Sequence, residues 1–213
     1  MYIPKTFRED DINTLHTLMN DYSFAILVTQ QDGVPFASHL PFLLDTKRGP
    51  YGTLMSHMAR ANSQWRGFDE VQEVLIIFQG PHTYVSPSWY VDNIEQSVPT
   101  WNYAVVHVYG KPRMIEDQTK LCDLLQALVQ KHEAMFEQPW PFQPSDEHMR
   151  KKLQGVVGFE IEITRLEGKG KLSQNRSAAD QECVVAALED NTEILGVGAT
   201  EVAKLMRKRS LGA

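Results

Sequence analysis

Cysteine is scarce in this 213-residue sequence, and signals for a membrane or for secretion are lacking. The two cysteines, Cys122 and Cys183, show no CxxC or other metal-binding spacing, so we expect buried free thiols rather than a disulfide or a metal site. No apolar run approaches the length of a membrane span. Residues 1–5 lack the apolar core of a signal peptide, which favours a cytoplasmic protein.

Several motifs that mark a function are also missing. There is no GxGxxG or GxxxxGK[ST] element, no recognisable helix-turn-helix, and no Ser/His/Asp or Cys/His motif for hydrolysis. The formal net charge of -6 argues against a protein whose whole surface binds a polyanion. Direct DNA binding therefore has weak support.

A basic cluster near the C-terminus runs against this acidic balance. It consists of Lys204, Arg207, Lys208 and Arg209. The cluster is compatible with a contact to nucleic acid. More simply, its cations favour the C-terminal end of the last helix through the helix dipole.

The predicted elements are short strands separated by turn residues, with helices between them. Strands are expected at residues 24–29, 34–44, 51–55, 71–78, 104–109 (with an extension at 111–114) and 156–163. Helices are expected at residues 8–20, 115–136, 146–153 (with Ser145 as its N-cap), 177–188 and 200–209. Asp32 and Gly33 predict a hairpin between the first two strands.

This pattern predicts an α+β protein, with a small β-barrel of about six antiparallel strands and peripheral helices. We expect a single domain over residues 1–213. A helical appendage is expected from about residue 168 onwards.

Residues 78–110 hold the densest group of prolines and aromatic residues. Because proline has no N–H to donate and restricts the residue before it, we expect an ordered loop between the strands at 71–78 and 104–109 rather than a helix or a central strand. Ordered loops of this kind often serve a site. Residues 165–176, which are polar and rich in glycine, are likewise not assigned to a strand.

Four ordered motifs carry a resemblance to a known family. They are GPHTYVSPSWY at residues 80–90, VPTWNY at 98–103, SHMARANSQW at 56–65 and KLSQNR at 171–176. Together with the MYIP start, they resemble the motifs of the PaiB-type FMN-binding negative transcriptional regulators, and the match runs essentially end to end.

The resemblance implies a fold and a role. The fold is the flavin-binding split barrel, similar to pyridoxamine phosphate oxidases and flavin reductases, in which two subunits pair and FMN lies in the groove between them. The role is repression of genes for degradative enzymes and sporulation. A cytoplasmic homodimer is therefore expected.

The resemblance also implies where the flavin binds. In split barrels the flavin phosphate is held by polar and basic residues on and just after a central strand, and the SHMARANSQW motif matches that stretch. We expect phosphate contacts from His57, Arg60 and Asn62. Ser38 and His39, at the end of the hairpin's second strand, are expected to face the same pocket.

The remaining expected contacts come from the other motifs. Trp101 with Asn102 is expected to cover the isoalloxazine ring from the partner chain. Lys171, Gln174 and Asn175 match the last motif and are expected to contact a ligand or the dimer partner. These residue types supply the cations, the donors and the flat apolar surfaces that FMN needs.

Two other interpretations stay open. His39, His57, His82 and His107 lie on or near predicted strand ends. Because related split barrels include haem-degrading proteins with a His ligand, haem is an alternative cofactor, although no metal-like spacing links these four residues and each is compatible with a core or loop position. A flavin-dependent oxidoreductase is the alternative to a regulator, and it needs an open pocket beside the flavin.

Overall fold

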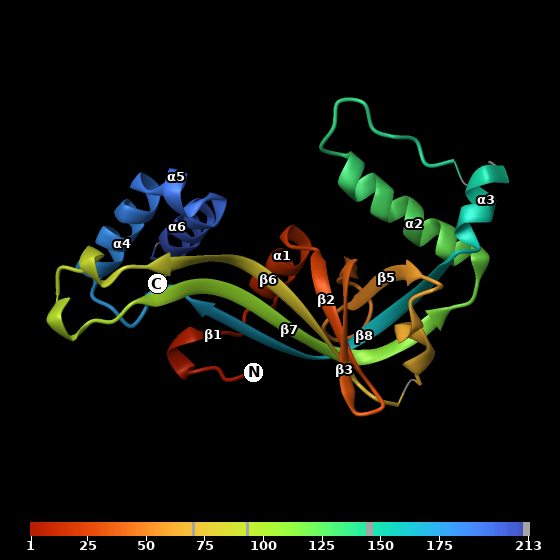
Figure 1. Ribbon diagram of the computed structural model, residues 1–213, viewed down its shortest axis with the longest axis horizontal. Helices are drawn as coiled ribbons and strands as arrows, with labels where there is room; N and C mark the ends of the chain where they lie inside the picture. Colours follow the sequence, from red (N-terminus) through yellow and green to blue (C-terminus); the bar gives the residue numbers. More distant parts are fainter. Residues whose placement is uncertain (70, 93, 144–146, 211–213) are drawn as a thin grey trace. The chain divides into compact units, whose positions relative to one another are not determined.

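The computed structural model describes residues 1–69, 71–92, 94–143 and 147–210 (Figure 1). The chain forms two compact units. Unit 1 consists of Met1–Asp11, Gln79–Val106 and Glu167–Ala213, and unit 2 consists of Ile12–Phe78 and His107–Leu166. Three long strands are divided between the units: β6 (Val74–Val85), β7 (Thr100–Ile115) and β8 (Val156–Lys171).

The described strands form an eight-stranded sheet in the order β3-β2-β6-β7-β8-β5-β4, with β1 paired to β8. The shorter strands are β1 (Arg8–Glu9), β2 (Phe24–Gln31), β3 (Val34–Pro41), β4 (Leu43–Asp45) and β5 (Thr53–Ala59). The pairs β1–β8, β2–β3, β2–β6, β4–β5 and β5–β8 are antiparallel. The predicted α+β class with antiparallel strands is therefore confirmed, with β1 added and the run 34–44 divided at Phe42.

The hairpin of unit 2 confirms the Asp-Gly signal. Asp32 and Gly33 have φ angles of 51° and 80°, the positive values that a tight hairpin turn requires. Gln31 consequently lies opposite Val34, and the antiparallel register continues along β2 and β3.

Unit 2 also contains α1 (Ile12–Asp21), η2 (Ser63–Gly67), α2 (Gln118–Glu133) and α3 (Glu147–Leu153). Asp117 caps α2 by accepting from two backbone N–H groups of its first turn. The apolar face of α2 buries Leu121, Leu124, Leu125 and Leu128. In the sheet core the ring of Phe42 makes edge contacts with Phe78 and Phe159, at centroid distances of 5.8 and 6.2 Å. Ser145, the predicted cap of α3, lies outside the described residues.

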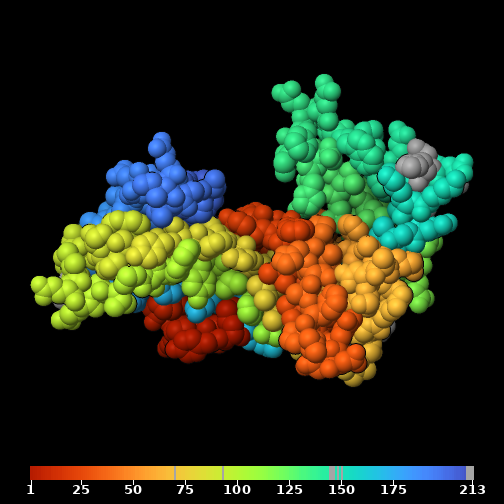
Figure 2. All heavy atoms as spheres, in the orientation of Figure 1, coloured from red at the N-terminus to blue at the C-terminus, as the bar shows by residue number. Residues whose placement is uncertain are grey.

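Unit 1 contains η1 (Lys5–Phe7), η3 (Pro87–Trp89), η4 (Ile94–Gln96), α4 (Ala178–Asp190), α5 (Thr192–Leu195) and α6 (Val197–Ser210). The last three helices group together beside β6 (Figure 1), and in the space-filling view they meet the segment that follows β6 (Figure 2). Val85, Tyr90 and Leu172 share a buried core with residues of α4 and α6. Gly198 allows α6 to approach β6, because a Cβ there would lie 2.6 Å from the carbonyl oxygen of His82.

The loop predicted at residues 80–90 is wrong in its first half, because β6 continues through Pro81 to Val85. The pairing of β2 with β6 involves Leu75 to Ile77, so the later part of β6 has no β2 partner on that edge. A proline on such an edge removes no ladder hydrogen bond there. Similarly, β8 extends through the glycine-rich residues to Lys171, with Gly168 and Gly170 buried and Lys169 and Lys171 half-buried.

Candidate functional site

A group of polar side chains lies where β5 ends and η2 begins, and we call it the β5–η2 junction (Ser38, Arg60, Asn62, Gln64 and Trp65). Asn62 is the N-cap of η2, since its Oδ1 accepts from the backbone N–H of Gln64 at 3.0 Å. Its Nδ2 donates to Ser38 Oγ on β3 at 2.8 Å. Two of the predicted residues are therefore in direct contact, and the hydroxyl proton of Ser38 is available to another acceptor.

Arg60 ties this junction to the start of β8. Its backbone N–H donates to Gly155 O at 2.8 Å, Nε donates to Gln154 O at 2.8 Å, and Nη2 donates to Val156 O at 3.1 Å. The indole N–H of Trp65 donates to Arg60 O at 3.0 Å. The side chain is exposed, so its remaining N–H groups face solvent while the others hold the backbone.

Gln64 is a member of the junction that the sequence did not single out. It is fully buried, and its Nε2 lies within 3.2 Å of three acceptors: Leu27 O, Thr29 Oγ1 and Phe36 O. Its Oε1 is buried without a hydrogen-bond partner. Only burial distinguishes this glutamine from an exposed one, and no residue pattern in the motif reports that burial.

The two predicted histidines of unit 2 do not join this group. His39 is exposed beside the ring of Phe24, whereas Ser38 is half-buried, because successive residues of a strand point to opposite faces. The expectation that Ser38 and His39 face one pocket is therefore wrong. His57 has a buried Nδ1 with no hydrogen-bond partner, and burial lowers its pKa below the ordinary value of 6.5. A neutral His57 adds no cation for a phosphate.

The predicted residues of unit 1 lie on a second surface, which we call the open face. It carries His82 and Tyr84 of β6, Trp101 and Tyr103 of β7, and Lys169 and Lys171 of β8. The indole of Trp101 is 53% exposed, with the rings of His82 and Tyr84 at centroid distances of 6.1 and 6.3 Å. A flat apolar ring is therefore presented to solvent next to cations.

Lys171 is the central cation of the open face. Its Nζ donates to Thr100 Oγ1 at 2.6 Å and to Trp101 O at 2.8 Å, so the ammonium is fixed at the start of β7. Burial lowers the pKa of Lys171, and repulsion from Lys169 and from Arg176 lowers it further. Lys171, which is predicted to contact a ligand or the dimer partner, thus has an unusual electrostatic environment.

Asn102 does not accompany Trp101. It is fully buried, and its Nδ2 donates to Ser173 Oγ at 2.9 Å on the side of α6. The expectation that both residues cover one ring is wrong for Asn102, because neighbours on β7 face opposite sides. Gln174 closes the turn after β8 by accepting from the backbone N–H of Leu172, and Asn175 is exposed.

The basic cluster at the C-terminus is largely neutralised inside unit 1. Arg207 binds Glu189 through two nitrogens, at 3.0 and 2.9 Å, and also contacts Glu182. Lys204 pairs with Glu201, and Arg209 pairs with Glu9. These ion pairs agree with an intramolecular role for three of the four cations.

Metal-binding groups are absent from the part of the chain that the structure describes. None of its His, Cys, Asp and Glu residues form a group of three that could hold a metal ion. Cys122 and Cys183 are free, as predicted, and they are half-buried. Among the same residues, no helix is both long enough and apolar enough to cross a membrane.

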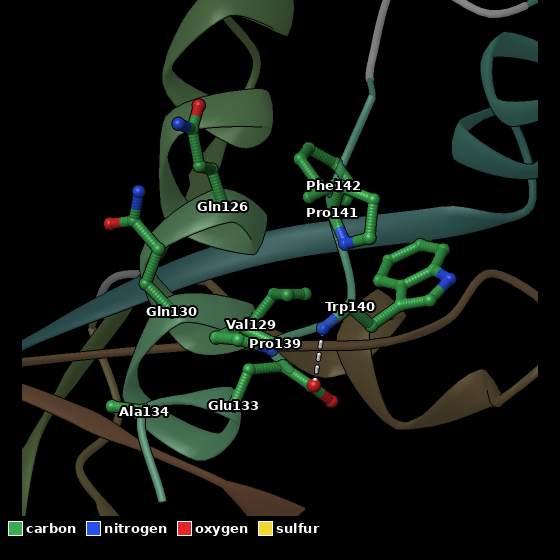
Figure 3. Close-up of a pocket in the computed structure, with 9 residues that line it drawn as sticks. All are labelled: Gln126, Val129, Gln130, Glu133, Ala134, Pro139, Trp140, Pro141 and Phe142. Carbon is green, nitrogen blue, oxygen red and sulfur yellow. Dashed lines mark hydrogen bonds between the residues drawn. The ribbon is translucent and has the colours of Figure 1, made fainter. Parts of the chain in front are cut away.

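A pocket of about 300 Å³ lies between the C-terminal half of α2 and the connector that follows it (Figure 3). The backbone N–H of Trp140 donates to Glu133 Oε2 at 2.6 Å and fixes the connector to the helix. The lining residues are Gln126, Val129, Gln130, Glu133, Ala134, Pro139, Trp140, Pro141 and Phe142. None of the residues expected to bind the flavin lines this pocket.

The antiparallel sheet with its helices has the split-barrel fold. The FAD- and haem-binding protein of Mycobacterium smegmatis matches with a TM-score of 0.60 at 17% identity, over 84% of this chain and 79% of that chain. The flavocytochrome Anf3 of Azotobacter vinelandii matches with a TM-score of 0.58 at 15% identity, over 79% and 72%. At these identities the likeness shows the fold.

The sequence comparisons then show the family. Residues 1–165 match the family described as "Putative FMN-binding domain", and the chain belongs to this family. Protease synthase and sporulation protein PAI 2 of Bacillus subtilis is 36% identical over 211 residues, which cover 98% of each chain. The uncharacterized protein AN0679 of Emericella nidulans is 31% identical over 248 residues, covering 98% of this chain and 97% of that one. The PaiB-type resemblance is thereby confirmed.

Proposed function

We propose that this protein binds FMN and serves as a negative transcriptional regulator of the PaiB type. The observation that carries the proposal is the family match over residues 1–165, which contains the whole β5–η2 junction. The full-length similarity to the sporulation protein PAI 2 supports the regulatory part. Bound FMN supplies electron and hydride transfer, while the chain binds and orients it.

The residues of the β5–η2 junction fit the chemistry of FMN. The phosphate needs cations, and exposed Arg60 and Arg66 supply them, the latter lying 5.6 Å from the ring centroid of Trp65. The hydroxyl of Ser38 and the amide of Asn62 supply neutral hydrogen-bond donors. Half-buried Trp65 offers an apolar surface.

In this proposal, the regulatory effect does not require the basic cluster at the C-terminus to bind DNA. The ion pairs of Arg207, Lys204 and Arg209 satisfy three of those charges within unit 1. Deleting residues 207–213 tests this point by an electrophoretic shift assay on promoter DNA. Loss of a wild-type shift on deletion would contradict it.

The proposal includes a cytoplasmic homodimer with the flavin at the subunit interface. Exposed apolar side chains on unit 1, Ile194 at 83% and Val197 at 78%, support a surface that a second copy covers. Analytical ultracentrifugation should give twice the chain mass. A monomer at micromolar concentration, with FMN still bound, would contradict this part.

Quenching of FMN fluorescence on titration with purified protein tests the cofactor. We expect tight binding, weakened about tenfold or more by Arg66→Ala or Ser38→Ala because each removes a ligand contact. Lys47→Ala, an exposed residue of the same unit, is the matched control and should not change the affinity. Absence of FMN binding, together with a Soret band on adding haem, would replace FMN by haem. NAD(P)H oxidation by the FMN-loaded protein would favour an oxidoreductase over a regulator.

A further inference from the structure

Three cations at the end of β8 lack carboxylate partners, and we call them the cation cluster (Lys169, Lys171 and Arg176). Among the residues that the structure describes, none of the three takes part in an ion pair. The formal net charge of the chain is -6, so carboxylates are plentiful elsewhere. The lack of an ion pair at these three cations is therefore a property of the local arrangement.

Two acidic residues on or beside β8 in unit 1 are engaged with other cations. Glu167 forms an ion pair with the N-terminal amine of Met1. Glu9, which follows Arg8 on β1 opposite Gly168, pairs with Arg209 at 3.5 Å. Both carboxylates thus have a cation outside the cluster as a partner.

The members of the cluster act on one another. Lys169 and Lys171 are two residues apart on β8, so they share one face of the strand. The charges of Lys169 and Arg176 both lower the pKa of Lys171, in addition to the effect of its burial. Three positive charges thus produce a local positive potential that an anion would relieve.

Neutral groups hold each cation in place. Lys169 Nζ lies 5.3 Å from the ring centroid of Tyr103 and 5.7 Å from that of Tyr2. Arg176 Cζ lies 4.1 Å from the ring centroid of Tyr90, and Nη1 donates to Ser97 Oγ at 3.1 Å. Aromatic rings and hydroxyls orient the cations without neutralising them. The charges are therefore preorganised and uncompensated.

An apolar ring stands beside these charges. Trp101 accepts from Lys171 Nζ through its carbonyl while its indole is 53% exposed. Phosphate and carboxylate groups are recognised by clustered Lys and Arg, and a planar ring is recognised by an exposed aromatic side chain. The cation cluster and the exposed indole together favour a ligand that carries both a ring and a phosphate.

We propose that the cation cluster and Trp101 bind an aromatic phosphate ester, with the phosphate on Lys169, Lys171 and Arg176 and the ring on the indole. The cluster lies after residue 165, beyond the part of the chain that matches the family. Two sources carry this chemistry. One is FMN itself, which rests on the proposed function for the cofactor but places its phosphate here instead of at the β5–η2 junction, and the other is a separate ester such as a nucleoside monophosphate.

Binding assays on the full-length protein test this site and distinguish the two sources. Isothermal titration calorimetry at low salt is run with FMN, riboflavin, AMP and inorganic phosphate. The variants are Lys169→Gln, Lys171→Gln and Arg176→Gln. Lys208→Gln, an exposed lysine of the same unit, is the control. Circular dichroism checks the fold, and Lys171→Met, which also removes the charge, replaces Lys171→Gln if the latter does not fold.

We expect the cluster variants to weaken binding about tenfold or more, because each loses a charge-assisted contact to phosphate. If FMN affinity falls while riboflavin affinity does not, FMN is the source. If AMP affinity falls while FMN affinity is unchanged, a separate ester is the source. If AMP affinity falls and FMN does not bind to the wild type at all, a separate ester is again the source, and only the proposed function fails. Unchanged affinities for FMN and AMP, or an equal loss in Lys208→Gln, overturn the site.

Discussion

The β5–η2 junction of unit 2 and the cation cluster of unit 1 use polar side chains in opposite ways. At the junction, Asn62 and Gln64 direct their hydrogen bonds to backbone groups and neighbouring side chains, so their main effect is to hold η2 against the hairpin. In the cluster, rings and a hydroxyl hold Lys169 and Arg176, and neither forms an ion pair with the residues that the structure describes. The first arrangement stabilises the fold, whereas the second leaves cations that can bind an anionic ligand.

Gln64→Leu should produce the largest effect, a loss of about 3 kcal/mol in the free energy of unfolding. The substitution removes the buried donor that lies within 3.2 Å of Leu27 O and Phe36 O and leaves those acceptors without it. Urea denaturation measures the change. Arg66→Leu, at an exposed position of the same short helix, is the control and should change stability little. An equally small effect of both substitutions would contradict the structural role of the junction.

Gly198→Ala should come next, with a loss of about 2 kcal/mol. The new Cβ would lie 2.6 Å from the carbonyl oxygen of His82, and backbone cannot yield as a flexible side chain can. A thermal melt should show the lowered midpoint, and Gly67→Ala, where a Cβ meets nothing within 4 Å, should not show it. Equal midpoints would mean that α6 packs less closely on β6 than described.

How far the sequence predicts this protein depends on whether a feature is local. The Asp32-Gly33 turn and the apolar spacing of α2 are encoded by neighbouring residues, and both were predicted. The continuation of β6 through Pro81 was not, because an edge without a β2 partner follows from the pairing of distant strands. A proline therefore predicts a loop wrongly when the pairing of the strand around it is unknown.

The candidate site divides in the same way. Ser38 and Asn62, both expected at the flavin site, are in contact, and Lys171, expected to contact a ligand or the partner, has a lowered pKa. Their role in binding stays a prediction. The motifs did not separate exposed Trp101 from buried Asn102, which are adjacent in sequence. Nor did they reveal Gln64 or Lys169, because burial and the lack of an ion pair among the described residues are properties of the packed chain.

Asn62→Ala should lower stability by about 1 kcal/mol, the usual effect of losing an N-cap. The same substitution removes the bond to Ser38, so it separates the two roles of the junction. If Asn62 mainly supports the fold, FMN affinity should fall less than in Arg66→Ala. Asn62→Ser, which restores a capping oxygen, should recover most of the stability. A loss of FMN affinity without any loss of stability would mean that Asn62 contacts FMN directly and does not mainly support the fold.

The smallest effect concerns acid pH and His57. Burial lowers its pKa below 6.5, so the unfolded chain takes up a proton on this residue before the folded chain does. The contribution is absent above the unfolded pKa, begins to destabilise as the pH falls below 6.5, and is complete below the folded pKa. His57→Gln should therefore lose less stability between pH 7 and pH 5 than the wild type in urea denaturation, whereas His132→Gln, at an exposed position of α2, should follow the wild type. If stability falls equally with pH in the wild type and in His57→Gln, water reaches His57, and the end of β5 is as accessible to solvent as the open face of unit 1.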